Sequence, residues 1–200
     1  MERKYFAIGL FFMLLIVAVF DMQLSRAEKA EQAWKLKYET SQDSLMKRIE
    51  TMESKWKAID EVSKNIGILS PKVKEKSKLK LAFYIIYYGE KYPLVNNEVL
   101  NIMTSIPAVE STYYKYAIGS VGERGYYQIH PVHLKQFNKK TIHLAFGEQF
   151  QVKEAYRILM EQVEKYDRIA KALNGYNGWA SLRNPYYGKI QRKVNMITNI

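Results

Sequence analysis

The chain has 200 residues, 48% of them hydrophobic, and contains no cysteine, which excludes disulfides and lipid attachment through a thiol. Its formal net charge of +11 is uneven: residues 1–71 carry 11 basic against 10 acidic side chains (+1), and residues 72–200 carry 20 against 10 (+10). Such a field attracts anionic polymers, nucleic acids included. Because no recognition-helix or RNA-binding motif accompanies the charge, we expect no specific nucleic-acid binding.

The chain begins with an apolar segment. Sixteen uncharged and mostly bulky residues run from Tyr5 to Phe20. At about 1.5 Å per helical residue this run is slightly short for a bilayer core and slightly long for a signal peptide. Small residues at Ser25 and Ala27 also fit a cleavage site. We predict a membrane anchor or a cleaved signal segment over residues 1–24, and favour the anchor.

Residues 25–71 are predicted to form an amphipathic helical stalk and a linker. Their apolar side chains follow a four-three spacing with one polar position at Ser63: Leu45, Ile49, Met52, Trp56, Ile59 and Ile66. This register is typical of a coiled coil that mediates self-association, and it is explained equally well by packing against the chain's own domain. Pro71 and the lysine-rich stretch 72–80 predict the linker that follows.

The remaining chain, residues 72–200, is predicted to be one mainly α domain. Helical apolar spacing covers residues 79–92, 99–106 and 152–173, whereas the alternation typical of strands is scarce. About 120 residues are enough to enclose one hydrophobic core.

One acidic residue extends an apolar helix face. Val99, Met103, Ile106 and Glu110 follow one another at helical spacing, so Glu110 continues a stripe that faces the core. Desolvation disfavours the charged form of such a carboxyl and keeps its proton available near neutral pH. Pro107 predicts a kink, or a helix that ends before it. Taken alone, an acid at this place is more often a helix-end residue or an ion-pair partner than a catalyst.

Glycines at intervals of three follow this acid within the segment from Glu110 to Pro131: Gly119, Gly122 and Gly125. Glycine tolerates the left-handed backbone of tight turns, and this spacing is not that of a phosphate-binding loop. We interpret Glu123, between two of the glycines, as a solvated charge. The histidines (His130, His133 and His143) accompany no metal-binding pattern, so we predict neither a metal nor another cofactor.

Taken together, the segment resembles the catalytic core of the soluble lytic transglycosylase family, which has the goose-type lysozyme fold. The matching positions are Glu110, Ser111, Tyr113, Ala117, Gly122, Gly125, Gln128, Ile129 and Pro131. A second family block resembles residues 172–179 (Ala-Leu-Asn-Gly-Tyr-Asn-Gly-Trp), and a weaker third block resembles residues 186–190.

The resemblance implies a lysozyme-like catalytic domain over residues 72–200 in which Glu110 is the catalytic acid and base. It implies substrate-binding roles for Gln128, Tyr127, Tyr176, Asn177 and Tyr186, and structural roles at the site for Ser111, Gly122 and Gly125. Two positions depart from the family pattern, since Gly119 stands where a serine is usual and His130 where a methionine is common.

The implied reaction cleaves the β-1,4 bond between N-acetylmuramic acid and N-acetylglucosamine in peptidoglycan and leaves a 1,6-anhydro end. The resemblance also implies a location in the cell envelope, with the catalytic domain facing the cell wall. There the enzyme would open the wall locally for a secretion, conjugation or phage machine. The basic residues after the apolar segment favour the opposite orientation, but the substrate lies outside the membrane. Two alternatives stay open: a peptidoglycan hydrolase on the same scaffold, and a non-catalytic wall-binding scaffold protein.

Overall fold

The computed structural model describes residues 2–166, 168–178 and 184–199, and only the backbone of residues 2–18 and 27. The chain divides into two compact units, Met1–Glu53 and Ser54–Ile200. The predicted domain began at residue 72, whereas the second unit begins 18 residues earlier (72 − 54). The reason is that the last turns of the predicted stalk supply core side chains to the second unit.

Helix α1 runs without interruption over Glu2–Leu69 and contains the whole four-three register. The downstream part of the register packs into the domain core, where Ile59, Ser63 and Ile66 are buried together with Val62. The upstream part is exposed: Leu45, Ile49, Met52 and Trp56. Packing against the chain's own domain therefore explains the downstream part, and self-association through the upstream part stays a prediction.

The predicted apolar span, Tyr5 to Phe20, lies within α1, but its side chains up to residue 18 are outside the described part of the chain. Among the residues whose side chains the structure describes, no helix is apolar over a long enough stretch to cross a membrane. The membrane anchor stays a prediction.

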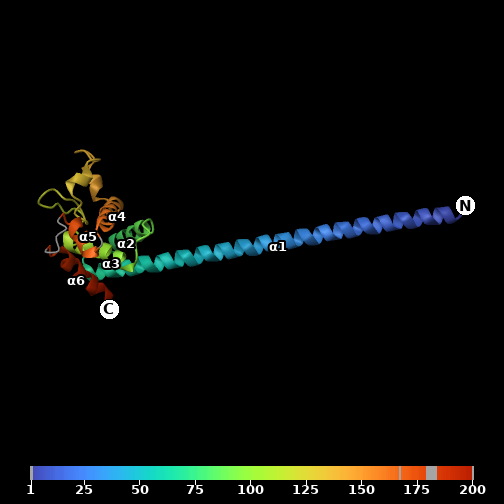
Figure 1. The fold of residues 1–200 in the computed structure, drawn as a ribbon, viewed down its shortest axis with the longest axis horizontal. Coiled ribbons are helices and arrows are strands. Elements are labelled where there is room, and N and C mark those ends of the chain that lie inside the picture. Colours follow the sequence, from blue (N-terminus) through green and yellow to red (C-terminus); the bar gives the residue numbers. More distant parts are fainter. Residues whose placement is uncertain (1, 167, 179–183, 200) are drawn as a thin grey trace. The chain divides into compact units, whose positions relative to one another are not determined.

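The second unit is built from helices, as predicted. They are α2 (Glu75–Gly89), α3 (Asn97–Glu110), α4 (Glu148–Lys165), α5 (Ile169–Tyr176) and α6 (Tyr186–Thr198), with short 3-10 helices η1 (Pro131–Leu134) and η2 (Ile142–Phe146). Figure 1 shows α2 to α6 gathered into one bundle, in which α3 packs against α2 and α6, and α4 against α2 and α5. Within the described ranges no strand forms, and Arg124 makes isolated bridges to Ile118 and Ile129.

The predicted helix over residues 152–173 is wrong in one respect, because the structure divides it into α4 and α5. The backbone is extended at Tyr166 (φ −127°, ψ 133°) and at Arg168 (φ −124°, ψ 129°), which ends one helix and begins the next. The two helices then approach closely: a Cβ at Gly175 would lie 2.4 Å from the Gln162 Oε1 and 3.1 Å from the Tyr166 ring. This break turns α5 back so that its end reaches the site.

Helix α3 does not end before Pro107, as one of the two predicted outcomes required, but continues to Glu110. Proline has no N–H to donate to the carbonyl four residues earlier, which here is that of Met103. The Tyr127 hydroxyl donates to that carbonyl instead, at 2.9 Å. The backbone group that proline leaves unpaired is thereby satisfied from outside the helix, and Glu110 keeps its place at the helix end.

Candidate active site

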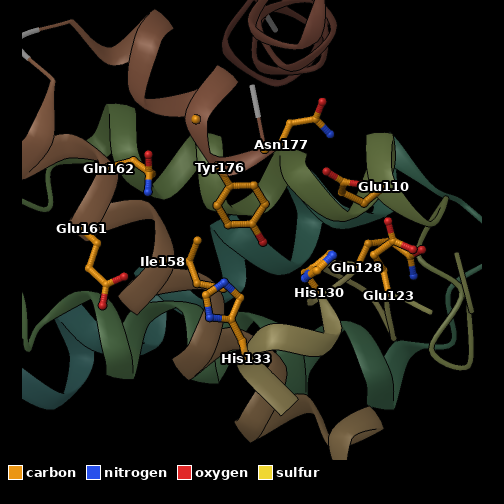
Figure 2. Close-up of a pocket in the computed structure, with 12 residues that line it drawn as sticks. Glu110, Glu123, Gln128, His130, His133, Ile158, Glu161, Gln162, Tyr176 and Asn177 are labelled. Carbon is orange, nitrogen blue, oxygen red and sulfur yellow. The ribbon is translucent and has the colours of Figure 1, made fainter. Parts of the chain in front are cut away.

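Glu110 opens onto a pocket of about 230 Å³ in the second unit. Figure 2 shows the acid with Gln128 and Glu123 along one side of this pocket, Ile158, Glu161 and Gln162 along the other, and the Tyr176 ring between them. The other lining residues are His130, His133, Gly175, Asn177 and Gly178. The pocket is thus assembled from the end of α3, the motif segment, η1, α4 and the end of α5.

Burial raises the pKa of the Glu110 carboxyl above its ordinary value, because the charged form loses solvation. Three groups act in the opposite direction and lower this pKa: the nearby Tyr186 hydroxyl and Asn177 side chain, which favour the carboxylate as polar neighbours, and the Lys189 ammonium, which favours it by its charge. The Glu123 carboxylate adds to the shift in the upward direction. The net result is a carboxylic acid that holds its proton more tightly than an exposed one, as a general acid requires.

Tyr186 is 3% exposed, and its ring stacks against that of Tyr176 at 6.4 Å between centroids and 17° between planes. Its hydroxyl lies close enough to Glu110 to affect the pKa of the carboxyl, yet no partner within the described residues meets full hydrogen-bond geometry with it. The Tyr186 hydroxyl and the Glu110 carboxyl are therefore neighbours that do not form a hydrogen bond in this arrangement. A buried phenol without a partner, beside the acid, can donate to a rotated carboxyl or to a bound molecule.

The late part of the chain places Tyr186 through two asparagines. The Asn174 Oδ1 in α5 accepts from the Tyr187 N–H at 2.9 Å, and the Asn184 Oδ1 accepts from the Tyr186 N–H at 3.0 Å. The start of α6 is therefore tied to α5. These hydrogen bonds bring the second sequence block (172–179) and the third (186–190) together near Glu110.

The residues predicted to bind substrate fall into two groups. Gln128, Tyr176 and Asn177 line the pocket. Tyr127 does not, because its side chain is fully buried and its hydroxyl is used on the Met103 carbonyl. Its predicted contact with substrate is replaced by a structural role beneath the site. Tyr186 is also absent from the lining, and its buried hydroxyl lies near Glu110.

The predicted structural residues hold the motif segment against α3. The Ser111 hydroxyl faces the Tyr126 carbonyl at 2.9 Å and that of Pro107 at 3.2 Å, which links the segment to the helix end. Gly122 and Gly125 adopt φ of +92° and +77°, where a side chain would strain the backbone. Gln128 also has a positive φ, +48°, and its amide donates to the Gly125 carbonyl at 2.9 Å.

Gln151, a residue that the motif did not indicate, anchors this segment from α4. It is fully buried, and its Oε1 accepts from the Tyr127 N–H at 3.0 Å while its Nε2 donates to the carbonyls of Arg124 and Ala145. One side chain thus makes hydrogen bonds to three backbone groups of two different segments, and ties the motif segment to the start of α4. A glutamine beside the apolar positions of α4 gave no signal of this role in the sequence.

Helix α4 also supplies pocket residues that the sequence did not indicate: Ile158, Glu161 and Gln162. On the same side, the Arg157 guanidinium contacts the carboxyls of Glu154 and Glu161 and lies 3.0 Å from the His133 Nδ1. Burial lowers the pKa of His133, and the neighbouring guanidinium lowers it further. In the part of the chain that the structure describes, no cluster of three or more His, Asp or Glu side chains is arranged to hold a metal ion.

The arrangement is that of a glycosidase-type site, with a partly buried acid of raised pKa at the edge of a polar pocket. Comparison with protein families gives one match, to the family described as Transglycosylase SLT domain, over residues 83–188. The chain therefore belongs to the SLT transglycosylase family, and membership indicates lytic transglycosylase activity on peptidoglycan. No similar curated protein and no similar solved structure was found.

Proposed function

We propose that this protein cleaves the β-1,4 bond between N-acetylmuramic acid and N-acetylglucosamine and leaves a 1,6-anhydromuramoyl end. The observation that carries the proposal is the position of Glu110: a partly buried carboxyl of raised pKa at the edge of a pocket that Gln128, Tyr176 and Asn177 also line. A carboxyl of raised pKa keeps its proton to a higher pH than an exposed carboxyl does, and can deliver that proton to a leaving glycosidic oxygen.

In this reaction the Glu110 proton passes to the glycosidic oxygen as its bond to the muramoyl C1 breaks. The muramoyl 6-hydroxyl then forms a bond to C1 and loses its proton to a carboxylate, and no water is consumed. The polar side chains of Gln128 and Asn177 offer hydrogen bonds to sugar hydroxyls and amides, and the Tyr176 ring offers an apolar face. The excess of basic residues in 72–200, +10, favours approach of an acidic glycan.

The chemical identity of the products tests the proposal. Purified sacculi digested with the full chain are expected to release muropeptides that end in 1,6-anhydromuramic acid, which mass spectrometry distinguishes by the absence of one water. Products with a reducing muramic acid end would contradict the lyase reaction. If folded protein releases no muropeptides from the sacculi, the result would instead favour a non-catalytic scaffold protein that binds the wall.

A hydrolase on the same scaffold is the second candidate, and one observation favours it. Glu123 lines the same pocket as Glu110, although the sequence indicated a solvated charge there. Glycoside hydrolases ordinarily use two carboxyls, one as the acid and one as the base or nucleophile. In a hydrolase, the second carboxylate would accept a proton from an attacking water molecule. The same mass measurement shows whether water or the muramoyl 6-hydroxyl is the attacking group.

For its place in the cell, we propose an envelope protein whose apolar N-terminal segment holds the domain at the membrane, on the side of the wall, in the service of a secretion, conjugation or phage machine. The support is the uncharged run from Tyr5 to Phe20 together with a substrate that lies outside the membrane. Cell fractionation tests the anchor: the full chain should sediment with membranes and resist extraction by alkaline carbonate. Recovery of the intact, uncleaved chain in the soluble fraction would contradict it.

A further inference from the structure

We propose that α1 pairs with α1 of a second copy of this chain and forms a parallel two-stranded coiled coil over residues 38–56. The four-three spacing indicated such self-association only in general terms. None of these residues lines the pocket of Glu110, so the pairing does not depend on glycan cleavage.

The pairing surface is an apolar stripe along one side of α1. With the positions of each seven-residue repeat lettered a to g, Ile49 and Trp56 occupy a, and Tyr38, Leu45 and Met52 occupy d. These five side chains are 40–65% exposed. The b, c and f positions between residues 40 and 54 are all polar: Thr40, Asp43, Ser44, Lys47, Glu50, Thr51 and Ser54. The helix is therefore amphipathic at the spacing of a coiled coil.

No other element of the first unit covers this stripe. The described residues of that unit, 2–53, all belong to α1, which is one uninterrupted helix (Figure 1). A helix alone in water is marginally stable, because most helical stability in proteins comes from packing of an apolar face. The same register is packed further along the chain, where Ile59, Ser63 and Ile66 are buried. For the upstream part, a second chain can supply the equivalent packing.

The residues of the stripe favour two strands, and an identical copy offers the matching surface. In parallel coiled coils, a β-branched residue at a and leucine at d favour the dimer. Ile49 is at a and Leu45 is at d. A single polar residue at a fixes the register at some cost in stability, and Gln42 occupies such a position. In a parallel dimer in register, each of these residues faces its own counterpart.

The charged residues beside the stripe favour the parallel direction. In a parallel pair, a residue at g faces the residue at the following e of the other helix, five positions later. Arg48 is at g and Glu53 is at that e, so each copy offers an opposite charge to the other. Both side chains are exposed, and within the described residues neither forms an ion pair. An antiparallel pair would instead bring the g positions together, where Arg48 and Lys55 are both basic.

Parallel pairing also agrees with the proposed N-terminal anchor. Two chains held in one membrane by their N-terminal segments have stalks that begin at the same surface and run in the same direction. Confinement to a membrane raises the effective concentration of each stalk for the other. This matters for a stripe shorter than three heptads, since short helices pair weakly.

Disulfide crosslinking tests the pairing, because the chain has no cysteine and an introduced thiol is then the only one. Leu45→Cys and Met52→Cys, made separately in the full chain, each place a thiol at d. In a parallel pair in register, each thiol faces its counterpart within reach of a disulfide. Mild oxidation should convert both variants to a product of twice the 23.5 kDa chain mass.

Ser54→Cys is the matched control. Ser54 is exposed and occupies f, on the side of the helix away from the stripe. Its thiol should crosslink only through random collisions, at a rate lower by about tenfold or more, because thiols held in an interface have a high effective concentration. Equal rates for the control and the two d variants would overturn the inference. Crosslinking of only one d variant would contradict the parallel register, since in an antiparallel pair a residue meets its own counterpart only at the centre of symmetry.

A charge within the stripe tests the same surface in a second way. Ile49→Lys, combined with Met52→Cys, sets two ammonium groups against each other across the pair. The crosslinking rate should fall to that of Ser54→Cys. Thr51→Lys adds the same charge at c, outside the stripe, and should leave the crosslinking rate of Met52→Cys unchanged. Undiminished crosslinking with Ile49→Lys would contradict the proposed surface.

The number of strands is measured on the wild-type chain. A lysine-reactive crosslinker should give the dimer as the largest product, and a trimer would overturn the two-stranded assignment. None of these readouts uses glycan cleavage. An inactive protein that still crosslinks through d would therefore contradict the proposed function alone, and an active protein without crosslinking would contradict the pairing alone.

Discussion

Replacement of Glu110 by glutamine is expected to lower the release of soluble fragments from purified sacculi by about 10²- to 10⁴-fold at neutral pH, the range that a general acid contributes. Glutamine has nearly the shape of the acid and can donate hydrogen bonds, but it cannot transfer a proton to the leaving oxygen. Turbidity loss of sacculi and chromatography of the released muropeptides measure the effect. Undiminished turnover would contradict the proposed role.

A matched control is available on the same helix. Glu98 lies in the first turn of α3 and is exposed, so Glu98→Gln changes the same chemical group outside the pocket. Its rate should equal that of the wild type. Since burial raises the pKa of Glu110, wild-type activity should fall as the pH rises through that pKa, and this fall should come at a higher pH than an exposed carboxyl would give. Glu110→Gln should show no such limb, because no proton remains to be lost.

Replacement of Gly125 by alanine is expected to destabilise the second unit by about 2–5 kcal/mol. The left-handed backbone (φ +77°) costs an alanine about 1–2 kcal/mol. The new Cβ would also lie 2.6 to 2.8 Å from the amide atoms of Gln151, and overpacking of this kind costs about 1–3 kcal/mol. Gln151 cannot move away cheaply, because it is fully buried and bonded to three backbone groups.

Gly178→Ala separates the two contributions. Gly178 has a comparable φ of +89°, but a Cβ there meets nothing within 4 Å. We expect a loss of about 1–2 kcal/mol from backbone strain alone. Urea unfolding followed by near-ultraviolet circular dichroism, which reports the packed tyrosines, measures both midpoints. Equal midpoints for the two variants would show that the Gln151 contact does not constrain the motif segment.

The family was predictable from the chain, and so was the position of the acid proposed to be catalytic, because both depend on local order. Glu110, Ser111, Gln128 and the glycines follow one another at fixed intervals, and such intervals survive whatever surrounds them. The helical character of the domain was predictable for the same reason, since apolar spacing is a local property. The match over residues 83–188 confirmed the family.

Three particulars of the site were not predictable, and each depends on contacts distant in the chain. Tyr127 lies within the motif yet faces the core, where its hydroxyl pairs with the Met103 carbonyl that Pro107 leaves free. Gln151 holds the motif from another helix. Glu123 lines the same pocket as Glu110. No pattern of spacing indicates which side of a turn a carboxyl occupies.

By itself, the sequence determined the family, the uneven charge and the position of the acid proposed to be catalytic, because these depend on residue identity and on spacing along the chain. Only the tertiary structure showed that the last turns of α1 belong to the domain and that Tyr127 lies in the core. It also showed that Glu110 and Glu123 line one pocket. The physical reason is that burial, desolvation and steric exclusion are properties of the space between elements. For Glu110, the surrounding elements set how tightly the carboxyl holds its proton, because withdrawal from water is the largest influence on its pKa.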